Sequence, residues 1–303
     1  MSDTGSYYGK PIINPPVWAE RDIAGYLFTG GLAGASSLLA AGADVTGRPA
    51  LARPARVTAT GAIVVSLGAL IHDLGRPGRF LNMLRVFKPT SPMSMGVWVL
   101  AAYAPLTVTA LASDALDRAP RTGRAAGVAA ALLGAGVSTY TAALIADTAV
   151  PAWHDGHREL PYVFAGSAAS AAAGAGLLAA PVTQSGPAAR LAVLGAVAEL
   201  AAEHAMERRL GMVAGALRGG TAGRRLKAAK ALTATGALGA ATIARRGRAG
   251  AALSGAALLA GSALTRFGLF EGGMASARDP RYTVEPQRAR RADAAARARR
   301  DPG

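Results

Sequence analysis

The sequence contains no cysteine, few aromatic residues and few charged ones. Without cysteine it has neither a disulfide framework nor thiolate ligands for an iron–sulfur cluster. Aromatic residues make up 5% and charged residues 17% of the 303 residues, whereas an average composition has about 25% charged residues. Because long segments carry no charge at all, an ordinary soluble domain is a poor fit.

Acidic residues are also scarce, with 18 Asp and Glu against 33 Lys and Arg, so the net charge is +15. Such a charge raises the possibility of nucleic-acid binding. The arginines, however, stand in short turns between apolar segments, for example at 47–49, 118–121 and 245–248. They do not form one basic face, so we expect a membrane protein with no nucleic-acid partner.

A helix needs about 20 residues to cross about 30 Å of hydrocarbon, and eight segments match this requirement to different degrees. They are 23–43, 54–74, 89–113, 125–146, a span within 160–189, 187–210, 231–244 and 249–270. Of these, 231–244 is the weakest. The sequence therefore predicts an all-α integral membrane protein in the prokaryotic cytoplasmic membrane. Eight transmembrane helices would place both termini on one face, called side A below.

Polar segments flank the predicted membrane domain 23–270. Residues 1–22 are polar and carry no signal-peptide pattern, so we expect the first span to direct insertion. Residues 271–303 form a basic tail, of which 277–303 is expected to be disordered or helical only on a partner or lipid. Lys and Arg are more frequent on side A, and the positive-inside rule then places side A in the cytoplasm.

Glycine and alanine dominate the apolar segments, and glycine alone accounts for 38 residues. Lipid tails are as apolar as leucine, so membrane helices associate through close approach at small residues. The runs 30–34 and 134–136 are the clearest such surfaces. We interpret them as helix-packing surfaces.

Five polar side chains fall at similar depth near side A: Asp22, Tyr26, His72, Asp73 and Tyr140. A quinone ring has two carbonyls that need hydrogen-bond donors, and its redox reaction moves two protons. Tyr and neutral His can donate, and Asp can relay a proton. This layer therefore suits quinone binding. Interfacial anchoring of the tyrosines and solvation of the helix ends are the simpler interpretations.

The predicted helix 187–210 carries a line of acids, in which Glu203 follows Glu199 by four residues on the same face. Glu199 falls near mid-bilayer, where ionisable groups are costly and usually functional. We interpret Glu199 and Glu203 as candidates for proton transfer. Alternatively, Glu203 reaches water while Glu199 pairs with a neighbouring helix.

The connection between the second and third spans alternates basic and apolar residues. Its cations are Arg76, Arg79, Arg85 and Lys88. This pattern is typical of an interfacial segment or a partner-docking surface. A metal at His154 and His157 has weak support, because no further ligands cluster there. A haem held by His72 and His204 remains a minor alternative.

Three sequence motifs stand out: YLFTGGLAG at 26–34 with Asp44 after it, HDLGRPGRF at 72–80 and FKPTSPMS at 87–94. Together they resemble the NrfD / polysulfide reductase membrane-subunit family over about residues 8–270. The second and third motifs carry most of the specificity.

The resemblance implies eight helices in two four-helix bundles, with no haem or iron–sulfur cluster in the chain. It implies a non-catalytic electron-transfer subunit of an oxidoreductase complex that acts between menaquinone, or another quinone, and a ferredoxin-like iron–sulfur subunit. That partner would serve a molybdopterin oxidoreductase subunit. Many family members carry their catalytic partners outside the cytoplasm, whereas the charge rule places side A inside.

The resemblance also implies three quinone-pocket positions. Tyr140 matches the family's Tyr, whereas Tyr26 stands where the family has His and Asp22 where it has Asn. Tyr26 can still donate a hydrogen bond, but an ionised Asp22 only accepts. We expect His72 with Asp73 to supply the missing donor and proton carrier. A membrane anchor or proton-translocating subunit without a quinone site is the alternative function.

Overall fold

The computed structural model describes residues 12–76, 78–288 and 291, and these contain helices and no strands. Eight of the helices have 20 residues or more. They are α1 (Glu20–Val45), α2 (Pro49–Asp73), α4 (Pro92–Leu116), α5 (Pro120–Ala146), α7 (Leu160–Ala179), α8 (Gly186–Leu210), α10 (Gly220–Thr242) and α11 (Arg248–Arg278). The shorter ones are α3 (Gly78–Met83), α6 (Pro151–His154), the 3-10 turn η1 (Gly211–Val213) and α9 (Ala214–Arg218).

Six of the described helices are long and apolar enough to cross a membrane: α1, α2, α4, α5, α7 and α11. The chain is therefore a multi-pass membrane protein by helix length and composition. Helices α8 and α10 lie where the sixth and seventh spans were expected, but they do not meet this criterion. Acids interrupt α8, and basic residues crowd the first half of α10. Eight long helices are thus present, whereas eight membrane spans remain a prediction.

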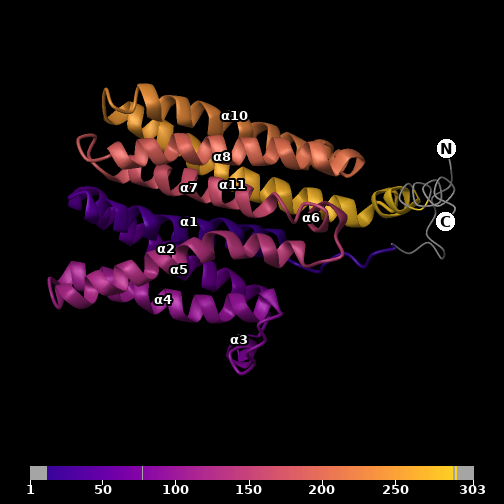
Figure 1. Cartoon of the computed structure of the whole chain (residues 1–303), viewed down its shortest axis with the longest axis horizontal. Coiled ribbons are helices and arrows are strands. Elements are labelled where there is room, and N and C mark those ends of the chain that lie inside the picture. The colour runs from indigo at the N-terminus through magenta and orange to yellow at the C-terminus, as the bar shows by residue number, and fades with distance from the viewer. Residues whose placement is uncertain (1–11, 77, 289–290, 292–303) are drawn as a thin grey trace, which may run out of the picture.

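The long helices run side by side along the long axis of the molecule (Figure 1). In the first half of the chain α1 packs against α2 and α5, and α4 packs against α5. In the second half α7 packs against α8 and α11, and α10 against α11. Helix α7 also packs against α1 and α5. The two halves therefore share an interface, and a division into two four-helix bundles is not established.

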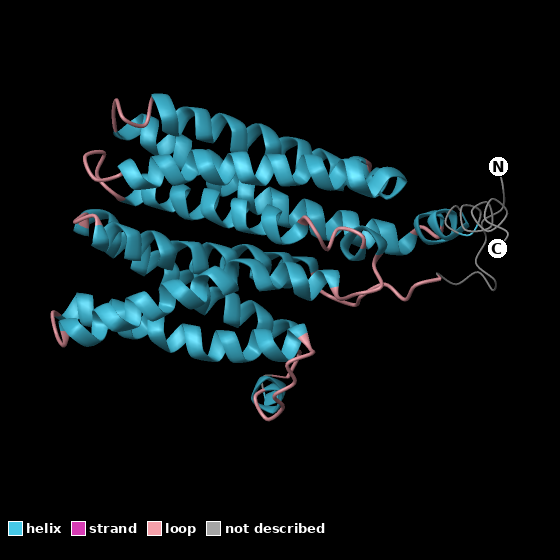
Figure 2. Cartoon of the chain, viewed as in Figure 1, coloured by secondary structure: helices cyan, strands magenta, loops and turns pink. Residues whose placement is uncertain are grey.

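The start of α1 and the end of α11 meet at one end of the bundle, which is side A (Figure 2). Trp18 stacks on Trp153 at 5.9 Å between ring centroids, and Trp153 lies 5.6 Å from Phe270. Arg225 of α10 pairs with both Glu20 and Glu271. The first and last long helices thus meet on one face. The two termini themselves lie outside the described residues, as do residues 289–290 and 292–303 of the tail. In the described part of the tail, α11 continues to Arg278 and residues 281–288 are helical.

Glycine allows the closest helix contact in the first half. A Cβ at Gly134 of α5 would lie 2.6 Å from the carbonyl oxygen of Gly34 on α1, a distance that real Cβ atoms do not show. The second half has a similar contact between Gly174 and Gly255. Small residues therefore let the backbones touch. This confirms the interpretation of 30–34 as a packing surface. In the run 134–136 only Gly134 packs, because Gly136 is exposed and a Cβ there would meet nothing within 4 Å.

The helix ends follow local sequence rules. Proline occupies the first turn of α2, α4, α5, α7 and α8, where its missing N–H is not needed. The carboxyl end of α7 is capped by Arg248, whose guanidinium donates to the carbonyls of Leu177 and Ala180 at 2.8 and 3.1 Å. This cation at the negative end of a helix is a favourable placement.

Candidate functional site

A cavity of about 100 Å³ opens between the side A ends of α1, α2, α4 and α5. Its walls are mostly apolar, as in most small-molecule sites. Three predicted site residues contribute to it: Tyr26, Asp73 and Tyr140. The other lining residues are Trp18, Ile23, Leu70, Leu74, Met83, Met93, Gly96, Val97, Leu100, Leu144 and Ile145.

Tyr140 of α5 borders the cavity with a buried hydroxyl that has no hydrogen-bond partner among the described residues. Its ring lies directly against Gly96 of α4, where any Cβ would overlap it. An unpaired buried hydroxyl is costly, so a partner in the cavity would stabilise it. Tyr140 is therefore positioned to donate a hydrogen bond to a ligand.

Tyr26 of α1 contributes the second phenol. It is buried, at 3% exposure, and no hydrogen bond of its hydroxyl occurs with the described residues. Its backbone carbonyl accepts a hydrogen bond from Ser66 of α2 at 3.3 Å, which ties the two helices together. Two phenols from different helices thus line one apolar cavity.

Asp22 and His72 do not line this cavity. His72 Nδ1 lies 2.8 Å from Asp22 Oδ2, and the His72 side chain is 80% exposed. Asp73 does line the cavity, and its Oδ1 accepts a hydrogen bond from the Ala19 amide at 3.2 Å. The five predicted residues therefore separate into three that line the cavity and an Asp22–His72 pair at the surface beside it.

Glu199 and Glu203 of α8 are both buried, at 1% and 2% exposure. Glu199 Oε1 accepts a hydrogen bond from Thr265 of α11 at 2.8 Å, while its Oε2 has no partner among the described residues. Neither carboxylate oxygen of Glu203 is hydrogen-bonded there, although Lys230 Nζ lies 3.7 Å away. Lys230 also pairs with Glu207, so the row of charged side chains on α8 extends toward side A.

The last span was expected to end at residue 270, but α11 continues to Arg278, and Arg266 lies inside the protein. It is 1% exposed. Its guanidinium lies 3.6 Å from the centre of the Phe164 ring, donates to the Phe164 carbonyl at 2.8 Å and interacts electrostatically with Glu199. It also contacts Gly31 of α1. A buried cation therefore sits where the two halves meet.

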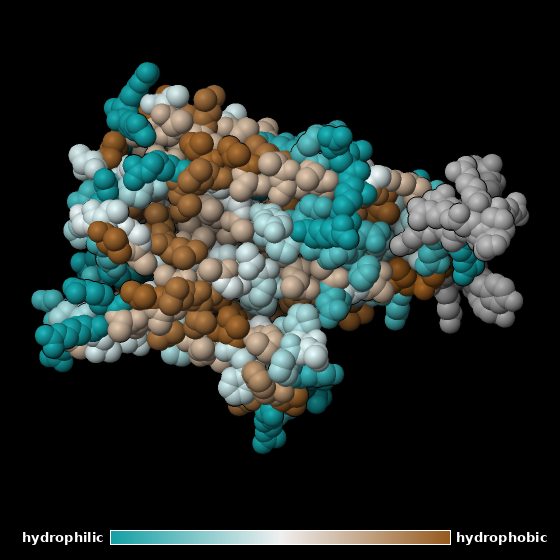
Figure 3. All heavy atoms as spheres, in the orientation of Figure 1, coloured by the Kyte–Doolittle hydropathy of each residue, from teal (hydrophilic) through white to brown (hydrophobic). Residues whose placement is uncertain are grey.

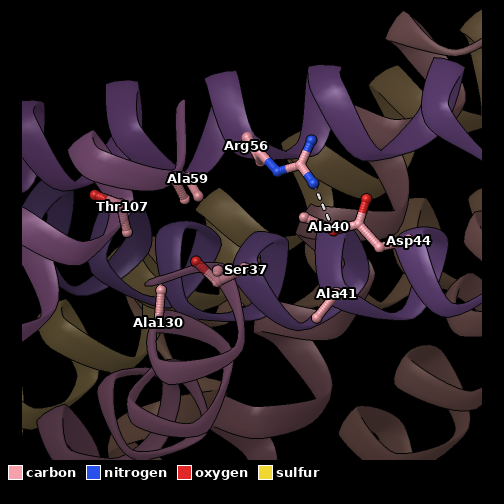
Figure 4. A pocket seen from close by; sticks show the side chains of 10 residues that line it. Ser37, Ala40, Ala41, Asp44, Arg56, Ala59, Thr107 and Ala130 are labelled. Carbon is pink, nitrogen blue, oxygen red and sulfur yellow. Dashed lines mark hydrogen bonds and ion pairs between the residues drawn. The ribbon is translucent and has the colours of Figure 1, made fainter. Parts of the chain in front are cut away.

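On the opposite face, side B, Arg56 of α2 pairs with Asp44 of α1 at 2.5 Å and with Asp114 of α4 at 3.1 Å. Figure 4 shows Arg56 directed at Asp44 in a small pocket of about 10 Å³, which Ser37 also lines. Ser37 shares a hydrogen bond of 2.7 Å with Tyr103. This ion-pair network holds three helices together, and sequence reasoning missed it.

The predicted docking cations Arg76, Arg79, Arg85 and Lys88 are exposed in and around α3. Arg79 donates to the Leu74 carbonyl at 3.2 Å, and no ion pair of these four cations occurs within the described residues. Docking to a partner stays a prediction. Among the described residues, no group of three or more metal-ligating side chains occurs.

Sequence reasoning also missed part of the cavity wall. Gly96 and Met93 lie in α4, Met83 in α3, and Trp18 precedes α1. Gly96 is a glycine at the same depth as Tyr140, and this was the available signal. No sequence rule, however, predicts that these two residues are in contact. Such a contact depends on how α4 and α5 rotate against each other.

Comparison with known protein families agrees with this arrangement. A family model described as "Polysulphide reductase, NrfD" matches residues 13–243, which is well over half of the chain. Among individually curated proteins, none matches the sequence. Members of this family are membrane subunits that associate with oxidoreductase complexes. The chain belongs to the NrfD family, and its helices and family place it as a membrane subunit of a respiratory oxidoreductase complex.

Proposed function

We propose that this protein is the quinone-reactive subunit of its complex, passing electrons between menaquinone and a peripheral iron–sulfur subunit on side A. The observation that carries the proposal is the side A cavity with two phenols free to donate. A molybdopterin oxidoreductase subunit would complete the complex, in the prokaryotic cytoplasmic membrane. The bound quinone would supply the two-electron and two-proton chemistry.

The residues present fit such a ring. Its carbonyls need donors, and the hydroxyls of Tyr140 and Tyr26 border the cavity without partners among the described residues. Apolar side chains such as Leu70, Val97 and Leu100 exclude water from the space between them. Among the described residues, Asp73 is the one carboxylate that lines the cavity, and it can accept a proton there.

The Asp22–His72 pair then connects the cavity to water. His72 follows Ile71 at the end of α2 and directly precedes Asp73, and its exposed ring is held by Asp22. An imidazole has two ring nitrogens, so it can accept a proton on one and release a proton from the other. We assign this pair to proton exchange between Asp73 and the side A solution, and not to direct contact with the ring.

Buried acids favour proton transfer in the second half as well. Three carboxylate oxygens of Glu199 and Glu203 lack hydrogen-bond partners among the described residues. Buried polar atoms of this kind are usually satisfied by internal water. Glu199 and Glu203 would then hold protons along α8, with Glu207 and Lys230 at the side A end.

The test is quinone turnover by the purified complex with a water-soluble menaquinone analogue. Removing the hydroxyl in Tyr140→Phe should lower turnover about fivefold, because one hydrogen bond to the reacting group contributes about 1 kcal/mol. Tyr103→Phe is the matched control, since Tyr103 is also a buried phenol but bonds Ser37 outside the cavity. Equal losses in both variants would contradict the site.

A subunit that only anchors or moves protons is the competing function, and the buried acids are the observation that favours it. In that case quinone analogues would neither bind nor protect the complex, and Tyr140→Phe would leave electron transfer unchanged. Glu199→Gln would still alter proton movement in proteoliposomes. The two experiments together separate the functions.

A further inference from the structure

The segment between α2 and α4, together with the start of α4, carries an apolar surface that no described residue covers. Five large side chains are between 40% and 67% exposed: Leu81, Val86 and Phe87 in this segment, and Met93 and Trp98 near the start of α4. Phe87 and Trp98 contact each other edge to face at 6.0 Å, so these two side chains form one ordered surface. A soluble environment does not favour such a concentration of exposed apolar groups.

The same segment is strongly basic. Arg76, Arg79, Arg85 and Lys88 are exposed, and the sequence contains no acid between Asp73 and Asp114. The positive charge is therefore not neutralised locally. Cations beside exposed aromatic and aliphatic groups are the composition of a segment that lies in a lipid interface.

The location of α3 agrees with this environment. In Figure 2 α3 stands out from the side of the bundle at the side A end and is seen nearly along its axis, across the direction of the long helices. Figure 3 shows brown and teal atoms next to each other on this protrusion. A short helix in this position lies parallel to the membrane surface if the long helices cross it.

The neighbouring helices provide the reason to choose lipid as the occupant. In its most apolar window only 28% of α2 and 33% of α4 are buried, against 72% of α1. These two spans thus form the outer wall of the first half, where hydrocarbon must cover residues such as Val64 and Val65. The exposed surface of α3 continues that wall at the level of the headgroups.

We propose that residues 78–98 form an interfacial lid that binds anionic phospholipid in the side A leaflet. Leu81, Phe87 and Trp98 would enter the acyl boundary, where tryptophan is enriched in membrane proteins. Arg79, Arg85 and Lys88 would bind the headgroup phosphates. Trp98 Nε1 donates to the Val86 carbonyl at 3.3 Å, which keeps the indole against the lid.

The lid also forms part of the cavity wall through Met83 and Met93. A hydrophobic ligand would then reach the cavity from the bilayer beneath α3, without passing through water. This consequence rests on the proposed quinone function, whereas the binding of lipid does not. The tests below use no quinone, so the two proposals can fail separately.

The charge component is tested by native mass spectrometry of the full chain in detergent with added phosphatidylglycerol. The triple variant Arg79→Gln, Arg85→Gln, Lys88→Gln should bind this lipid at least tenfold more weakly, since each cation near an anionic surface contributes about 1 kcal/mol. The matched control removes three exposed side A cations that make no ion pair with the described residues: Arg158, Arg208 and Arg224. It should retain the lipid.

The apolar component is tested by fluorescence quenching with lipids brominated in the upper acyl chain. Wild-type protein in nanodiscs should be quenched, and Trp98→Phe should lose most of the quenching, because Trp153 is buried and Trp18 lines the cavity. Unchanged lipid binding in the triple variant would overturn the proposal. If that variant instead lost its peripheral subunit while keeping the lipid, the cations would serve protein docking. Quenching that Trp98→Phe leaves unchanged would overturn the proposal as well. If the triple variant does not fold, Arg79→Lys with Arg85→Lys should keep the lipid.

Discussion

The two halves of this protein place their polar groups in opposite ways. In the first half the tyrosine hydroxyls line a cavity that opens at side A, and the charged pairs stand at the two surfaces. In the second half Glu199, Glu203 and Arg266 are sealed between packed helices. The first arrangement leaves donors available to a ligand. The second stores charge in the interior, where its stability depends on internal partners.

The largest expected effect comes from breaking the sealed charges. Arg266→Ala should destabilise the protein by about 3–5 kcal/mol, because it leaves the buried Glu199 without a compensating charge. The double variant Arg266→Met, Glu199→Gln should recover most of this loss. The measurement is thermal unfolding and folded yield in detergent. A stable Arg266→Ala variant would mean that the second half is open to water.

Replacing a glycine by alanine in each half should have a smaller effect on stability, and the effect should differ between the two halves. Gly166→Ala places a Cβ against the rigid backbone of Glu199 and Gly195, so we expect a loss of about 1–3 kcal/mol in unfolding free energy. Gly96→Ala meets only the Tyr140 ring, which can move into the cavity.

Gly96→Ala should therefore cost less stability but lower quinone turnover, because it displaces the Tyr140 hydroxyl. Thermal unfolding and turnover measured on both variants decide this. Equal destabilisation of the two would show that the first-half cavity is as tightly packed as the second-half interior.

The smallest effect concerns a surface pair at side A. Arg209 donates to both carboxylate oxygens of Glu159, at 2.6 and 2.5 Å. These hydrogen bonds hold the pKa of Glu159 below its usual value of 4.5. A lowered pKa stabilises the folded state above the unfolded pKa, and this contribution is lost as the pH falls through the folded pKa.

Glu159→Gln should therefore lose at most about 1 kcal/mol at pH 7 and show a shallower loss of stability below about pH 4.5. The matched control is Glu285→Gln, at an exposed acid for which no salt bridge occurs within the described residues. Its acid profile should match that of the wild type. The measurement is thermal unfolding between pH 3 and pH 7.

The predicted positions of residues along their helices largely agree with the structure. The predictions of which side chains lie next to each other agree only in part. The helix expected from Pro187 to Leu210 runs from Gly186 to Leu210, and Glu199 lies inside it as expected. Asp22 and His72 meet as members of one layer, yet they lie outside the cavity that Tyr26 and Tyr140 share. Spacing along a helix sets depth, at about 1.5 Å per residue, but it does not set rotation about the axis.

The sequence by itself determined that the chain is helical and apolar enough for a membrane, where most of its helices begin and end, and to which family it belongs. These properties reside in local composition, prolines and motifs. The tertiary structure alone decided which side chains share a space: Tyr140 against Gly96, Arg266 between the halves, and Arg56 between two acids. Those contacts depend on how closely glycines such as Gly34 and Gly134 let the helices approach, which local sequence does not specify.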